Sequence, residues 1–147
     1  MGATNPTKIH LVGSGRHEEG LAAGAITPGH LIKLNTNGEY VVHDNVQSHA
    51  ERAFAVEDAL QGRSIADAYA RGEWVSFVLG NVGDVVYGFL AGGELAHIGD
   101  FLTSDGHGCL QVADDSDVSQ VRLGIALEQV DQTESDDTKH RIKVRLI

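Results

Sequence analysis

The chain has 147 residues, 41% of them hydrophobic, and its 21 acidic and 11 basic residues give a formal net charge of −10. This length predicts about one domain, and no stretch approaches the roughly 20 apolar residues of a membrane span. The basic residues are scattered, which argues against a nucleic-acid-binding surface. The N-terminus lacks the layout of a signal peptide, so we expect synthesis in the cytoplasm.

The first elements along the chain predict an extended N-terminal arm over residues 1–25, followed by a β-barrel domain over 26–147. The arm segment contains several glycines, Pro6 and one apolar run at 9–12. The run leads into Gly13-Ser14-Gly15, as in a dinucleotide-binding unit. However, Glu18 stands where that fingerprint needs its third glycine, and a carboxylate there opposes a pyrophosphate. A nucleotide site is therefore rejected, and the glycines are interpreted as hinges.

The rest of the chain predicts an all-β fold, a small β-barrel that can consist of two similar β-units. Short runs with β-branched residues, several of them alternating, are separated by glycine-rich turns. The predicted strands are 31–34, 40–43, 53–57, 74–79, 85–90, 110–112, 123–128 and 141–146. The run 74–79 is more continuously apolar than the others, so it suits a central strand in which Trp74 and Phe77 pack in the core.

One short helix is predicted over 64–70. Ser64 can cap it, Asp67 stands in the capping-box position, and Gly72 follows as a C-terminal stop. Two turns are too few for a stable isolated helix, so this helix must pack on the sheet.

A weak internal repeat underlies the two-unit interpretation. Gly29 and Gly99 are 70 positions apart, as are Gly38 and Gly108, and the run 55–57 (AVE) resembles 126–128 (ALE). In both halves a strand, a glycine turn, a second strand and a long strand follow in the same order. Matches this short also arise by chance, so the repeat stays open at this point.

The sequence contains no motif that is typical of a catalytic or metal-binding site. The eight histidines are dispersed without the local spacing of a zinc site, and the acidic loops 114–120 and 131–140 lack the pattern of a calcium loop. Cys109 in a strand-like run is interpreted as a small buried side chain. We therefore expect no cofactor, no metal and no enzymatic activity, and a structural or binding role.

The ordered motifs of the chain resemble head decoration (cement) proteins of tailed bacteriophages. The similarity covers roughly residues 14 to 147, and it depends on the order of the motifs rather than on one of them. The motifs lie at 16–19 (RHEE), 25–29 (AITPG), 55–62 (AVEDALQG), 65–69 (IADAY), 83–87 (GDVVY), 98–102 (IGDFL), 124–131 (GIALEQVD) and 141–144 (RIKV).

This resemblance implies a β-barrel on the outer surface of the virion capsid, with no catalytic residues. It implies that the protein stabilises the expanded head as a clamp across neighbouring major capsid protein subunits, commonly as a homotrimer. It also gives the N-terminal segment a role, because an extended arm can add a strand to a partner's sheet edge. The residues predicted for this arm contact are Lys8, Ile9, His10, Leu11, Val12 and Arg16.

Three alternatives remain open from the sequence. The chain could be another virion β-domain, from a tail or a fibre. It could be a small ligand-binding β-barrel, although few aromatic residues are available for one. An enzyme that uses dispersed His and Asp residues is the third.

Overall fold

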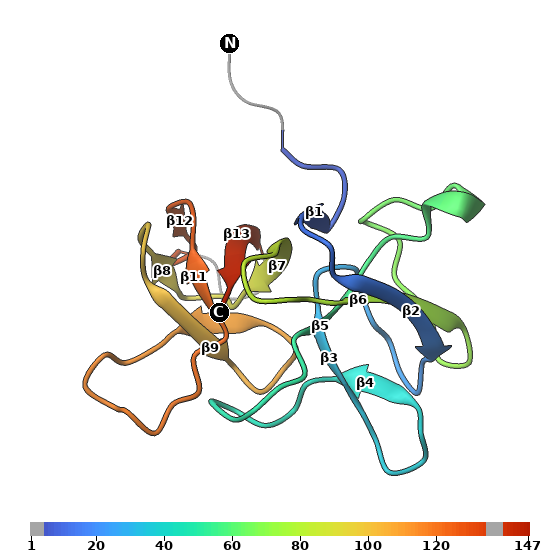
Figure 1. The fold of residues 1–147 in the computed structure, drawn as a ribbon, viewed down its shortest axis with the longest axis horizontal. Helices are drawn as coiled ribbons and strands as arrows, with labels where there is room; N and C mark the ends of the chain where they lie inside the picture. Colours follow the sequence, from blue (N-terminus) through green and yellow to red (C-terminus); the bar gives the residue numbers. More distant parts are fainter. Residues whose placement is uncertain (1–4, 135–139) are drawn as a thin grey trace.

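A computed structural model describes residues 5–134 and 140–147, and over them the chain is almost entirely β (Figure 1). The only helical element in these residues is one 3-10 turn, η1 (Ala59–Gln61). The strands are β1 (His10–Val12), β2 (Arg16–Leu21), β3 (Leu31–Leu34), β4 (Tyr40–Val42), β5 (Ala53–Ala55), β6 (Trp74–Leu79), β7 (Val85–Leu90), β8 (Leu95–Ala96), β9 (Phe101–Ser104), β10 (Leu110–Val112), β11 (Gly124–Ala126), β12 (Val130–Asp131) and β13 (His140–Leu146). The described residues contain no helix long and apolar enough to cross a membrane.

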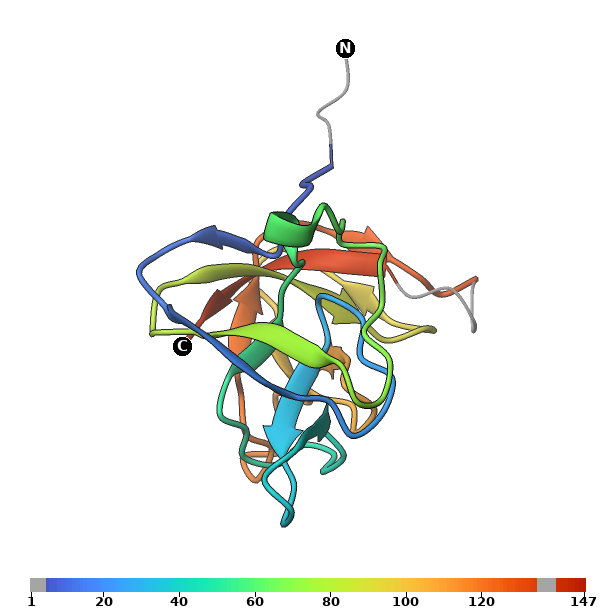
Figure 2. The same ribbon diagram turned by 90° about the vertical axis from the view of Figure 1, so that its right-hand side faces the viewer.

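Two five-stranded barrels lie side by side in Figure 1, and the first of them faces the viewer in Figure 2. The first follows the strand order β2-β6-β5-β3-β4, and a parallel bridge between Ala22 and Tyr40 closes it. The second follows β7-β13-β11-β9-β10, and the parallel pairing of Leu110 with Leu90 closes it. Closure covers the edges of the barrel strands, while β1 and the pair β8 and β12 lie outside the two barrels. The predicted all-β fold of two similar units is confirmed.

The strand registers establish the internal repeat. Ile32 pairs with Val42 in the first barrel, and Leu102 pairs with Val112 in the second, 70 positions later in both strands. The other strand pairings of the first barrel also recur in the second. The offset depends on the strand and lies between 67 and 71 positions. The repeat therefore covers the complete barrel topology, although few residues are identical.

The turn after β3 shows the repeat at the level of single hydrogen bonds. The side-chain Oδ1 of Asn35 accepts from the backbone N–H groups of Asn37 and Glu39. In the second barrel, Oδ1 of Asp105 accepts from the N–H groups of His107 and Cys109. Gly38 and Gly108 follow with φ of 78° and 80°, a conformation that favours glycine. The turn chemistry is thus conserved between the two halves.

Two clusters of buried side chains form the core. One fills the first barrel and includes Ile32, Phe77 and Tyr69. The larger cluster fills the second barrel but also contains Leu31 and Phe54 of the first. The outer face of the first barrel therefore packs against the second, and the two barrels share one apolar interior.

Arg141 of β13 also joins the two barrels. Its Nη2 atom donates to the carbonyl oxygens of Pro28 at 3.0 Å and Ile65 at 2.5 Å, both outside the second barrel. Its guanidinium carbon lies 4.5 Å from the ring centroid of Phe89. Burial lowers the pKa of this half-buried guanidinium, and the two carbonyls replace the lost water.

Three sequence predictions are corrected here. The first barrel begins at Arg16 rather than at residue 26, because β2 pairs with β6 along its whole length. Residues 64–70 form turns instead of a helix, because the backbone of Tyr69 pairs with Ile26 in both directions. Trp74 is 64% exposed, whereas Phe77 is buried as predicted.

Candidate functional site

The strand β1 contains the core of the predicted arm, and it lies on β7 of its own chain. His10 pairs with Val86 and Val12 with Val85, with an irregularity between the two pairs. Lys8, Val12 and Arg16 are exposed, while His10 and Leu11 are half-buried. The apolar residues of the segment that point inward are thus already covered within the chain.

Ile9 fixes the segment in front of β1 to both barrels. Its side chain is completely buried in the larger core cluster. Its backbone N–H donates to Oε1 of Glu57 at 2.9 Å, and its carbonyl accepts from the N–H of Tyr87 at 2.8 Å. Glu57 follows β5 of the first barrel and Tyr87 belongs to β7 of the second. A partner can therefore bind Ile9 only after this contact opens.

The glycine turn after β1 encloses a carboxylate of the same chain. Oδ2 of Asp84, a buried residue, accepts from the N–H of Gly15 at 2.9 Å and from that of Asn81 at 3.2 Å. Gly13 has φ of 118°, and a Cβ atom at Gly13 or Gly15 would overlap the Asp84 side chain. The N–H of Gly15, in the turn that resembled a phosphate-binding loop, thus donates to a side chain of the same chain.

Two histidines extend this network to the surface. Nε2 of His10 lies 3.3 Å from Oδ2 of Asp84, and Nδ1 of His10 lies 2.9 Å from Nε2 of His17. Burial lowers the pKa of His17, and the neighbouring His10 lowers it further, while Glu57 opposes both effects. Proton uptake at His17 therefore competes with the packed arrangement of β1 and β2.

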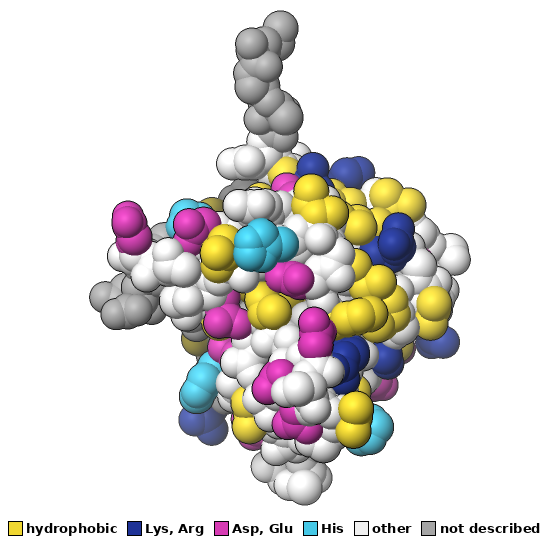
Figure 3. Space-filling model, turned by 90° about the vertical axis from the view of Figure 1, so that its left-hand side faces the viewer, with side chains coloured by type: hydrophobic (Ala, Val, Ile, Leu, Met, Phe, Trp, Pro, Cys, Tyr) yellow, Lys and Arg dark blue, Asp and Glu magenta, His cyan; other side chains and the backbone are white. Residues whose placement is uncertain are grey.

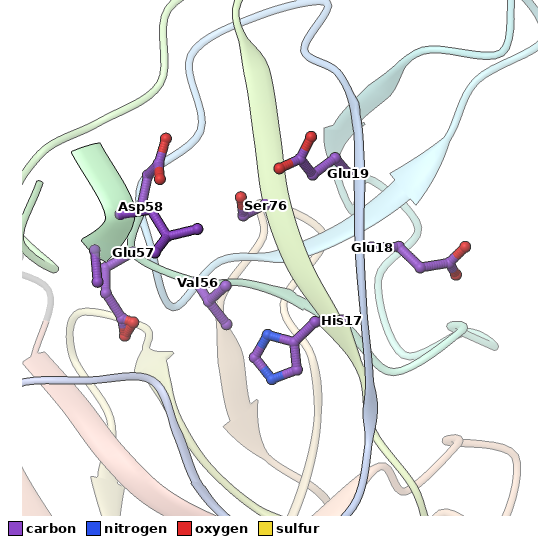
Figure 4. A pocket seen from close by; sticks show the side chains of 9 residues that line it. His17, Glu18, Glu19, Val56, Glu57, Asp58 and Ser76 are labelled. Atoms are coloured by element: carbon purple, nitrogen blue, oxygen red, sulfur yellow. The ribbon is translucent and has the colours of Figure 1, made fainter.

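An open pocket of about 640 Å³ lies beside this network, between β2 and the segment that leads into η1. Figure 4 shows Glu57 and Asp58 on one side of it, Glu19 and Ser76 on the other, and Glu18 turned away from them. His17 lines the same pocket. The pocket is acidic, so it suits positively charged groups.

The described residues do not combine into a metal or nucleophile site. No group of three or more His, Cys, Asp or Glu side chains is arranged among them to hold a metal ion. Cys109 is completely buried while His107 is exposed, so the two are not placed as nucleophile and base.

Asp84 is the important residue that sequence reasoning missed. It lies 69 positions after Gly15, and no short motif links the two. The internal repeat offers the one indication: when β7 is aligned with β2, Asp84 takes the place of Arg16, at the start of a barrel strand.

No protein-family model matches this sequence, and no curated protein matches it significantly. Among solved structures, the chain is similar to the N base of the head fibre protein gp8.5 of bacteriophage phi29. The two share 11% sequence identity with a TM-score of 0.59, over 91% of this chain and 95% of that one. At this identity the similarity concerns the fold, and it extends over nearly the whole of both chains: this chain has the fold of a phage head fibre base.

Proposed function

We propose that the protein is a structural component of a bacteriophage virion, a decoration protein that binds the outer surface of the expanded head. One observation carries the proposal: the fold is shared over nearly the full length with the base of a phage head fibre. The order of motifs that resembles head decoration proteins comes from the sequence alone and supports the same class.

The physical properties of the chain support this role. A protein that binds only the assembled shell stabilises it by mass action. Its partners are then the major capsid protein and further copies of itself, and a trimer multiplies the contacts on one shell. Two closed barrels with a shared interior form a rigid body, which a clamp across subunits requires. The role we propose is structural and not enzymatic.

The phi29 similarity favours a second candidate within the virion. That neighbour is the base of a fibre, so this chain could attach a fibre to the head instead of covering the shell. The two roles differ in copy number, because a shell decoration saturates many equivalent sites and a fibre base only a few.

Sedimentation with purified heads tests the proposal. Expanded, DNA-filled heads of the encoding phage, stripped of this protein, are mixed with the intact chain and pelleted. We expect co-pelleting that saturates at many copies per head and raises the temperature at which heads release DNA. Saturation at a few copies, without a thermal effect, identifies the fibre base instead. If the intact chain stays in the supernatant, the head-binding proposal is wrong.

The predicted arm contact needs variants that leave the barrels intact. Deletion of residues 2–20 would remove β2, so it tests folding rather than binding. Lys8→Glu combined with Arg16→Glu changes two exposed members of the predicted contact and none of the buried ones. Weaker co-pelleting of this variant, at unchanged thermal stability, supports the arm contact, and wild-type co-pelleting refutes it.

A further inference from the structure

One face of the first barrel is an interface with the second barrel. Leu31 pairs with Phe54 across β3 and β5, and Phe54 pairs with Val78 across β5 and β6. Opposite residues of neighbouring strands project from the same side of a sheet. All three side chains are completely buried, and all belong to the core cluster that fills the second barrel. This face of the first barrel is thus covered by the second barrel.

The second barrel presents the equivalent face to solvent. The repeat places Phe101, Ile125 and Arg145 at the positions of Leu31, Phe54 and Val78, and the pairings are the same. Val85 lies opposite Arg145, and Val12 of β1 lies opposite Val85. We call these five residues the outer row.

The outer row is accessible along its whole length. Val12 is 60% exposed and Phe101 37%, Arg145 is exposed, and Val85 and Ile125 are half-buried. The adjacent inward residues, such as Val144 and Leu102, are completely buried. Accessible apolar side chains gathered in this way on a folded domain commonly mark an interaction site.

The row is basic in a protein that is otherwise acidic. It contains Arg145 but no carboxylate, and Lys143 lies on the same side of β13, two residues away. Arg122 lies over the ring of Phe101 at 5.8 Å, held by the carbonyls of Gln120 and Asp114. Figure 3 shows the face at the left-hand side of Figure 1. Hydrophobic and basic side chains are interspersed over one part of it, and acidic side chains gather over another.

A complementary surface exists on the first barrel. The pocket beside η1 presents the carboxylates of Glu19, Glu57 and Asp58, together with apolar Val56 and Leu60, the last of which is fully exposed. A row of apolar and basic side chains matches a hollow of apolar and acidic ones. The two surfaces lie on different barrels of one folded chain, and a contact between them can form between two molecules.

We propose that the outer row of one copy docks against the acidic pocket of a second copy. The contact is head-to-tail, since it joins two different surfaces, and such contacts close into rings when the rotation permits. In this contact Phe101 and Ile125 would be covered by another molecule, as the equivalent Leu31 and Phe54 are covered by the second barrel within one chain. The inference concerns contact between copies and stands independently of binding to a phage head.

Sedimentation velocity of the purified full chain tests the inference. We expect the wild type to self-associate as its concentration rises, more weakly at high salt because the charge pairs are screened. Arg145→Glu, at an exposed position, is expected to weaken association by about tenfold or more. Glu19→Lys in the pocket is expected to act in the same direction. The double variant restores the charge complementarity and is expected to regain much of the wild-type association.

The controls separate this contact from folding and from other interfaces. Arg71→Glu makes the same charge change at an exposed position outside both surfaces, and it is expected to associate like the wild type. Arg145→Ala gives a milder change if Arg145→Glu lowers thermal stability. A wild type that stays monomeric, an Arg145→Glu variant that associates normally, or a double variant weaker than both single ones overturns the inference. Head binding by a monomeric wild type would overturn it while leaving the proposed function intact.

Discussion

The Oδ2 atom of Asp84 lies 2.9 Å from the backbone nitrogen of Gly15, so the start of the second barrel holds the strand that opens the first. Asp84→Ala leaves the buried N–H of Gly15 without its partner. We expect the free energy of unfolding to fall by about 3 kcal/mol, the size expected when a buried hydrogen bond to a charged group is lost. Urea denaturation measures this loss. Asp84→Asn keeps the shape and should lose less; equal stability of Asp84→Ala and wild type would contradict the assignment.

Stability should depend on pH through His17. Its pKa is lowered in the folded state, so the unfolded state takes up the proton more readily. The contribution of neutral His17 to stability is therefore complete above the unfolded pKa of about 6.5, and it falls as pH decreases from there to the folded pKa. His17→Gln should flatten this part of the pH dependence. Urea denaturation between about pH 8 and pH 5 compares the two proteins, and parallel curves would refute the prediction.

Two equivalent glycines should respond differently to the same substitution. Gly38 has φ of 78° and nothing within 4 Å of an added Cβ, so Gly38→Ala is expected to cost about 1 kcal/mol from backbone strain alone. Gly108 has φ of 80°, but a Cβ there would lie 2.8 Å from Cβ of Val42. Gly108→Ala should therefore cost about 1–3 kcal/mol more, since its neighbours must move. Thermal unfolding of both variants tests the difference, and equal losses would count against it.

Arg141→Lys should weaken the connection between the barrels. An ammonium group cannot reproduce the forked donation to Pro28 and Ile65 or the stacking on Phe89. We expect a loss of about 1–3 kcal/mol in the free energy of unfolding. The matched control is Arg145→Lys on the exposed side of the same strand, which should change stability by less than about 0.5 kcal/mol. If both substitutions act equally, Arg141 does not join the barrels in this way.

Most strands that consist largely of apolar residues were predictable from the sequence, whereas β2, β8, β9 and β12 were not among the predicted strands. The bounds of β3, β6, β7 and β10 agree with the predicted ranges. β2 reads RHEEGL, without the alternation that marks a half-buried strand. Its buried position 20 is a glycine, and the ring of Tyr40 fills the space where a side chain would point. The apolar side chain that fills this position of the barrel thus belongs to β4 and not to β2.

The other differences also come from contacts distant in sequence. Residues Ser64 and Asp67 do form the predicted capping hydrogen bond, but Tyr69 pairs with Ile26 and ends any helix. β6 has apolar residues on both faces, so its sequence does not show which of them face outward, and Trp74 was wrongly placed in the core. At the candidate site, the arm residues were identified as a segment, but their docking on β7 depends on Asp84 and Glu57, which no local pattern connects to them.

The repeat has a consequence for the stability of the fold. A barrel of half this length would bury a smaller fraction of its surface and be marginal alone. Because both barrels belong to one polypeptide, their association does not depend on protein concentration. Phe54 of the first barrel is completely buried, while its counterpart Ile125 in the second is half-buried. One of the two equivalent faces thus holds the molecule together, and the other remains accessible on its surface.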